Sequence, residues 1–185
     1  ALRGGWRVGG SVLFETFGYD PTLFTDYVIA RPTPTGTVYD PYVGTKRLPN
    51  RDYVFSFTVP TRKGLTADGL LLWGKDENFY EWSSADIAYV TVQLDWRPTE
   101  KLRMNGTYNL QQFKRRSDGS LVGRRQIPRL KLEYQATRAI FGRVIVQYDA
   151  QYQDDLRDDS RTERPIHIFS SDTGAYEPAL SQRRN

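Results

Sequence analysis

The sequence predicts an all-β fold, an antiparallel up-and-down meander that forms part of a transmembrane β-barrel. Three observations predict it. Apolar and polar residues alternate with a period of two over repeated segments of about 8 to 13 residues, which is the side-chain period of a strand. One side of these segments is apolar, and the other carries charges. Short and long connections alternate along the chain, as in outer-membrane barrels.

The composition excludes a helical membrane protein. The 185 residues are 38% hydrophobic and 14% aromatic, with a mean hydropathy of −0.62. The longest aliphatic and tryptophan run, residues 70–73, is far shorter than the roughly 20 apolar residues of a transmembrane helix. The chain starts at Ala1 without a basic-then-apolar leader, so we expect a mature or excised segment.

The residue types that are missing narrow the chemistry. The absence of cysteine excludes disulfides and thiolate sites, and His167 is the only histidine, so a histidine-rich zinc site is excluded. The net charge of +4 is spread along the chain and does not indicate nucleic acid. We therefore expect no enzymatic activity and no cofactor.

The first three strands are predicted over residues 5–17, 53–60 and 65–74. The second and third form a hairpin around the turn 61–64. Gly69, in the third strand, marks a candidate bulge. The first strand alternates throughout its length, with these residues on its apolar side: Trp6, Val8, Gly10, Val12 and Phe14.

The next hairpin consists of two strands and a proline-containing turn, at residues 86–96, 102–113 and 97–101. Opposing Trp96 to Leu102 keeps the apolar sides of both strands on one face. The same register sets Asp95 opposite Arg103, an attractive cross-strand pair.

The last predicted hairpin also has two strands and a turn, at residues 125–135, 140–152 and 136–139. Glu133 is expected to meet Arg143 across this pair, directly or diagonally. Phe141 and Ile145 interrupt the polar side of the return strand.

Four long loops are predicted, at residues 18–52, 75–85, 114–124 and 153–185. Seven strands are an odd number, whereas bacterial single-chain barrels close with an even number. Either residues 165–170 form a short eighth strand, or residues 1–185 are one segment of a larger barrel. We favour the larger barrel.

The two predicted faces have different roles in a barrel. Aromatic residues near the strand ends would form the lipid-facing girdles: Trp6, Trp96, Tyr134, Tyr148 and Tyr152. The opposite face would line a hydrated lumen with charged residues: Asp95, Arg103, Arg129, Lys131, Glu133, Arg143 and Asp149. The alternative is that the charges lie on the solvent face of an ordinary antiparallel sheet.

The predicted loops contain two groups of candidate contacts. Phe79, Tyr80 and Trp82 would form a sugar-stacking platform, although packing onto the barrel rim is the favoured interpretation. Arg115 and Arg116 would pair with lipopolysaccharide phosphates, because guanidinium groups bind phosphate through two hydrogen bonds. The alternative for these arginines is a solvated loop.

A carboxylate cluster follows the last predicted strand, at Asp154, Asp155, Asp158 and Asp159. Oxygen ligands suit Ca²⁺, which makes the cluster a weak calcium candidate. Arg157 and Arg161 supply counter-charges within it, so a self-neutralised surface loop is the favoured interpretation and no metal is predicted.

Four blocks of the sequence resemble recurring blocks of a bacterial protein family. They read GKDENFYEWSSADI, WRPTEKLR, RLKLEYQ and QYD, at residues 74–87, 96–103, 129–135 and 147–149. The family comprises outer-membrane β-barrel proteins of unknown function whose full-length members carry an N-terminal domain similar to carbohydrate-binding module 9. The resemblance covers most of the chain and matches the C-terminal part of the barrel. It implies location and architecture and no catalytic residues.

These observations predict a wall segment of a bacterial outer-membrane β-barrel with a charged lumen, acting as a pore, a translocation channel or a membrane scaffold. The expected partners are outer-membrane lipid, lipopolysaccharide and carbohydrate, with no nucleic acid. The alternative is a soluble all-β carbohydrate-binding module that uses Tyr80 and Trp82.

Overall fold

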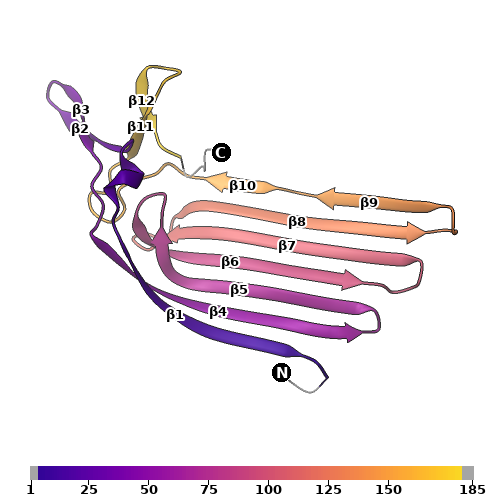
Figure 1. Cartoon of the computed structure of the whole chain (residues 1–185). Helices are drawn as coiled ribbons and strands as arrows, with labels where there is room; N and C mark the ends of the chain where they lie inside the picture. Colours follow the sequence, from indigo (N-terminus) through magenta and orange to yellow (C-terminus); the bar gives the residue numbers. More distant parts are fainter. Residues whose placement is uncertain (1–3, 181–185) are drawn as a thin grey trace.

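The computed structural model describes residues 4–180 and contains two antiparallel sheets (Figure 1). The larger sheet is a meander with the order β1-β4-β5-β6-β7-β8-β10, and β9 pairs with the remaining length of β8. Its longest strands, β4 to β8, have 14 to 16 residues. The bounds are β1 Arg7–Gly18, β4 Arg47–Arg62, β5 Leu65–Asn78, β6 Ser83–Trp96, β7 Leu102–Arg115, β8 Leu121–Gln135, β9 Phe141–Gln147 and β10 Ala150–Gln153.

A smaller, four-stranded sheet with the order β12-β11-β2-β3 lies at one end of the larger sheet (Figure 1). It is accompanied by a short 3-10 helix, η1, which Asp20 caps by accepting a hydrogen bond from the Thr22 amide at 2.9 Å. The bounds are η1 Pro21–Phe24, β2 Val28–Thr33, β3 Gly36–Pro41, β11 Ile166–Ser170 and β12 Ala175–Pro178. We call residues 19–46 and 154–180 the cap.

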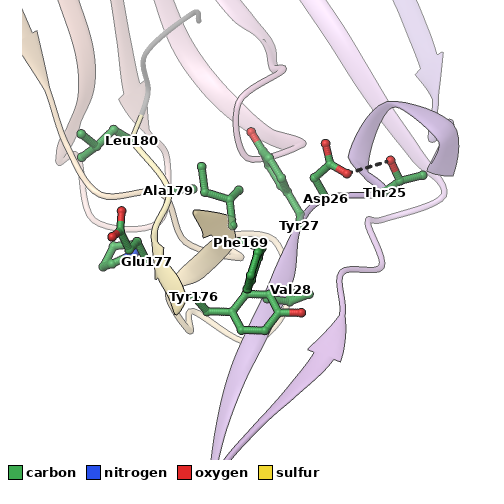
Figure 2. Close-up of a pocket in the computed structure, with 11 residues that line it drawn as sticks. Thr25, Asp26, Tyr27, Val28, Phe169, Tyr176, Glu177, Ala179 and Leu180 are labelled. Carbon is green, nitrogen blue, oxygen red and sulfur yellow. Dashed lines mark hydrogen bonds between the residues drawn. The ribbon is translucent and has the colours of Figure 1, made fainter. Parts of the chain in front are cut away.

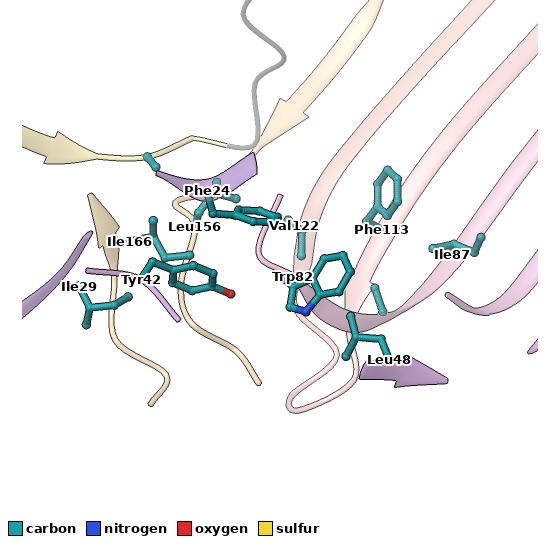
Figure 3. Packing of buried hydrophobic residues seen from close by; sticks show 12 residues of the cluster. Phe24, Ile29, Tyr42, Leu48, Trp82, Ile87, Phe113, Val122, Leu156 and Ile166 are labelled. Atoms are coloured by element: carbon teal, nitrogen blue, oxygen red, sulfur yellow. The ribbon is translucent and has the colours of Figure 1, made fainter. Parts of the chain in front are cut away.

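The buried apolar residues gather where the cap meets the larger sheet (Figure 3). Ile87 of β6 and Phe113 of β7 are register partners and belong to this cluster. From the cap, the Phe24 ring lies 5.9 Å from the Trp82 ring and 5.7 Å from the Tyr42 ring. Away from this junction the described strands form a single layer (Figure 1).

The larger sheet is open. Its edges are β1 on one side and β9 with β10 on the other, and the described strands do not close on themselves. The all-β antiparallel meander is therefore present, without barrel closure. No helix in residues 4–180 is long and apolar enough to cross a membrane.

Two of the four predicted long loops are short turns. The loop predicted at 75–85 is reduced to residues 79–82, and the loop predicted at 114–124 is reduced to residues 116–120. The predicted alternation of short and long connections is therefore wrong within the sheet. The ends of β5 to β8 extend into these predicted loops although apolar and polar residues no longer alternate there. The cap packs against these strand ends and buries side chains of both kinds.

The other two predicted loops contain the cap. The region 18–52 includes η1, β2, β3 and the start of β4, and the region 153–185 includes β11 and β12. The last five residues of that region lie outside the described residues. Residues 165–170 overlap β11, which belongs to the smaller sheet, so they do not add an eighth strand to the larger one.

The β6–β7 hairpin has a different register from the predicted one. Trp96 lies opposite Met104 rather than Leu102. A shift of two residues preserves the face of every side chain, so the apolar sides still coincide. Arg103 therefore reaches Asp95 diagonally, with 2.7 Å between Nη2 and Oδ2.

The β4–β5 hairpin has no bulge at Gly69, which pairs in register; the irregularity begins after Val59. The turn consists of Lys63 and Gly64, with φ values of 51° and 75°. The Gly64 carbonyl accepts a hydrogen bond from the Arg97 amide at 2.8 Å, which ties this turn to the neighbouring one. A Cβ atom at Gly64 would collide with the Arg97 carbonyl oxygen.

We expect Gly64→Ala to lower the unfolding temperature more than Gly119→Ala, measured by circular dichroism. The two glycines have φ of 75° and 74°, so alanine costs about 1 kcal/mol at each through the left-handed backbone. An added Cβ atom would collide with neighbouring backbone at Gly64, whereas nothing lies within 4 Å of a Cβ atom at Gly119. Equal losses in the two variants would contradict this packing.

Candidate functional site

The main candidate site is one whole face of the larger sheet. On each strand this face carries an uninterrupted run of apolar residues or glycine. The hydrogen-bond register brings the runs of neighbouring strands onto the same side, as in the opposition of Trp73 to Tyr53 and Ala88. We call the set the apolar band; it comprises alternate residues of the segments 8–14, 53–59, 65–73, 88–96, 102–110, 128–134 and 142–146.

Polar residues bound the apolar band at both ends of the strands. On the cap side, the same face continues with Arg51, Lys75, Asp86, Gln112 and Arg124. At the other end the strands enter turns that contain Lys63, Arg97, Lys101 and Arg138. The run 88–96 spans about 27 Å at about 3.4 Å per residue, close to the roughly 25 Å apolar belt of a membrane barrel.

Aromatic residues lie on this face near the ends of the band. Four of the five predicted girdle residues lie on it: Trp96, Tyr134, Tyr148 and Tyr152. Trp6 directly precedes β1, and the exposed fractions of all five are between 39% and 64%. Sequence reasoning missed Trp73, whose ring stacks on Tyr53 with 5.8 Å between centroids at the cap-side end. The sequence contains the signal that would have placed it on this face, because Trp73 and Tyr53 both alternate in phase with the apolar residues of their strands.

The opposite face, which we call the charged face, carries all seven predicted lumen residues. The predicted contact between Glu133 and Arg143 is confirmed at 2.9 Å. Phe141 and Ile145 interrupt this face, as predicted, and both are exposed. Six of the seven predicted residues take part in ion pairs: Asp95 with Arg103, Glu133 with Lys131 and Arg143, and Asp149 with Arg125.

A buried ion pair joins the cap to the larger sheet. Arg115, at the end of β7, has an exposed side-chain fraction of 2%, and Glu81, in the β5–β6 turn, has 0%. Arg115 Nε lies 3.0 Å from Glu81 Oε1. The guanidinium also donates to the Asp154 carboxylate at 2.6 Å and to the Asp155 carbonyl at 2.8 Å.

Glu81 is held from the cap as well. Its Oε1 accepts a hydrogen bond from the Arg157 amide at 2.9 Å, and its Oε2 accepts one from Asn78 at 2.9 Å. Its backbone carbonyl accepts the Tyr42 hydroxyl at 2.6 Å. The pair therefore connects the β5–β6 turn, the end of β7 and both halves of the cap.

A second polar group lies at the cap-side ends of β4 and β5. The Asn50 amide donates to Asp76 at 2.7 Å and to Glu77, so two carboxylates share one donor. Glu77 is 4% exposed. Burial first, and then the hydrogen bond and charge of Asp76, raise the pKa of Glu77 to about 8.

The predicted sugar-stacking platform does not form. Trp82 is 2% exposed and its indole NH donates to the Thr45 carbonyl at 2.7 Å. The Tyr80 ring packs edge-on against Phe113 at 5.8 Å, and only Phe79 is exposed. Tyr80 and Trp82 pack inward because the cap covers this turn, so their packing is against the cap and the sheet ends.

The structure separates the two arginines that were predicted to bind phosphate. Arg115 is buried and its donors are occupied, which contradicts a role at the surface. Arg116 is exposed and pairs with Asp86.

Three of the four carboxylates of the weak calcium candidate have separate partners. Asp154 accepts from Arg115, and Asp159 accepts from Arg157 at 2.8 Å. Asp158 accepts from the Thr162 hydroxyl at 2.7 Å. Among residues 4–180, no group of three or more His, Asp or Glu side chains has an arrangement that could hold a metal ion.

A hollow of the cap lies between residues 25–28, which follow η1, and the β11–β12 hairpin (Figure 2). Phe169 and Tyr176 lie side by side in it, with 5.5 Å between ring centroids. Its charged lining residues are Asp26 and Glu177, and none of its described lining residues is basic. This hollow therefore does not suit a phosphate group.

Comparison with protein-family models, curated proteins and solved structures finds no match to this chain.

We expect Arg115→Gln to reduce the free energy of unfolding by about 3–5 kcal/mol, because it leaves Glu81 buried without its cation. The double variant with Glu81→Gln should recover part of the loss. Arg116→Gln is the matched control and should cost less than about 1 kcal/mol, because its ion pair is exposed. Chemical denaturation of the four proteins measures this, and equal losses for Arg115 and Arg116 would contradict the junction.

We expect stability to fall as pH rises from 6 to 9. The folded-state pKa of Glu77, about 8, lies above its ordinary value of 4.5, so the folded protein holds a proton that the unfolded chain lacks in this range. Thermal melts should show an unfolding temperature lower by a few °C at pH 9, since about 1 kcal/mol corresponds to about 2–4 °C at this size. Glu77→Gln should flatten the pH profile, whereas Glu100→Gln, in an exposed turn, should leave it unchanged.

Proposed function

We propose that this chain is a wall segment of a bacterial outer-membrane β-barrel with a charged lumen, acting as a pore, a translocation channel or a membrane scaffold. The observation that carries the proposal is the apolar band. It extends across seven neighbouring strands, it is bounded by charged residues at both ends, and no described element covers it. Soluble monomers rarely expose apolar patches larger than a few hundred Å².

Lipid supplies the missing cover in this proposal. The height of the band fits the hydrocarbon core, and its aromatic residues fit the two interfaces, where Trp and Tyr are enriched. Each of the strands β4 to β8 is paired on both sides, which supplies hydrogen-bond partners for its backbone groups, as a bilayer requires. The two open edges would pair with further strands of the same barrel.

The charged face supports a hydrated lumen. Its ion pairs are partly exposed, with side-chain exposed fractions of 41% for Arg103 and 53% for Arg143. Charges with this exposure need water, which a channel interior supplies.

The distribution of connections supports one orientation of the wall. Both long excursions of the chain, which form the cap, lie at the same end of the strands (Figure 1). Among the described residues, the opposite end has the turns at residues 63–64, 97–101 and 136–140 and the residues directly before β1. Outer-membrane barrels have short periplasmic turns and longer extracellular loops, so we place the cap outside the cell.

We expect Val92→Arg in the full chain to prevent the heat-sensitive gel shift of a folded barrel in mild detergent. Val92 lies in the middle of the band, and arginine at mid-depth costs about 2–4 kcal/mol on a lipid-facing site. Thr91→Arg is the matched control: its position is adjacent but on the charged face, so the shift should remain.

A folded protein in plain buffer without detergent would refute the membrane assignment. Loss of the shift in both arginine variants would refute the assignment of the two faces.

A further inference from the structure

The charges on the charged face are segregated by strand. β1, β4, β5 and β6 contribute one cation, Arg7, and five carboxylates: Glu15, Asp52, Asp68, Asp76 and Asp95. Apart from the buried Arg115, β7 to β9 and the residues directly after β9 contribute two carboxylates, Glu133 and Asp149, and five cations: Arg103, Arg125, Arg129, Lys131 and Arg143. We call these five cations the basic strip.

The carboxylates within reach do not neutralise the basic strip. The single carboxylate of Glu133 forms ion pairs with two cations, at 3.5 Å from Lys131 and 2.9 Å from Arg143. Arg129 has no ion pair with any residue that the structure describes. Its register neighbours are Thr107 on β7 and Gln147 on β9, which are uncharged. A net positive charge therefore remains on this part of the face.

Uncharged donors surround the strip. On β7 the same face carries Asn105, Thr107, Asn109 and Gln111, which lie opposite the β8 cations and their neighbours. Amide and hydroxyl groups donate hydrogen bonds to anions without adding negative charge. Arginine offers a planar set of donors that matches carboxylate and phosphate oxygens.

We propose that the basic strip forms an anion-selective zone of the lumen along β7 to β9, so that small anions bearing carboxylate or phosphate oxygens, and halides, pass in preference to cations. The inference rests on the proposed function, since it requires the charged face to line an open lumen. The acidic strands β1, β4, β5 and β6 would then hold the counter-charge at a separate part of the same wall, and the strip would remain available to a passing anion.

The test is the ion selectivity of the full chain in planar lipid bilayers under a KCl gradient. We expect a chloride-to-potassium permeability ratio above 1. Arg129→Glu combined with Lys131→Glu should lower that ratio at least twofold. Lys114→Glu combined with Arg124→Glu is the charge-matched control, because both positions lie on the opposite face beyond the apolar band, and its ratio should equal that of the unchanged protein.

Three outcomes overturn the inference. They are a preference for potassium in the unchanged protein, an equal loss of selectivity in the control, and a protein that inserts without conducting. The heat-sensitive gel shift, measured on the same samples, separates these from failure of the proposed function. A protein that shows neither the shift nor insertion overturns the membrane assignment and the selectivity together.

Discussion

The buried pair of Arg115 and Glu81 is the interaction on which the arrangement of cap and sheet depends. Its partners lie 34 residues apart in sequence, and the Asp154 carboxylate lies 39 residues from Arg115. Removing two charges from water is costly unless their remaining donors and acceptors are satisfied. Here the cap supplies them, through the Arg157 amide and the Asp155 carbonyl. The pair is therefore tolerated only when sheet and cap are assembled, which links the folding of one to the other.

Away from the cap, no element that the structure describes covers the apolar band of the larger sheet. Its buried apolar cluster lies only at the cap junction, so most of each strand has no core of its own. In water, such a single layer would leave the apolar band uncovered. Under the proposed function, hydrocarbon covers one face and lumen water solvates the other. The same strands that form a core with the cap at one end would then form the membrane wall along the rest of their length.

Much of the candidate site could be predicted because strand faces are local. The girdle residues, the lumen residues and the contact of Glu133 with Arg143 all follow from alternation within single hairpins. The failures share a cause. Trp82 and Arg115 were assigned to the predicted long loops 75–85 and 114–124, yet each is 2% exposed. Their burial comes from cap segments that local pattern cannot place.

The sequence by itself determined which side chains share a face, because the pleat of a strand alternates side chains with a period of two regardless of context. It also determined that the fold is all-β. Only the tertiary structure decided that β2, β3, β11 and β12 leave the meander and form a second sheet. It also decided that the ends of β5 to β8 are covered by the cap. These features depend on contacts between segments far apart in sequence, such as Ile29 with Ile166 and Glu81 with Arg157, for which no local spacing rule exists.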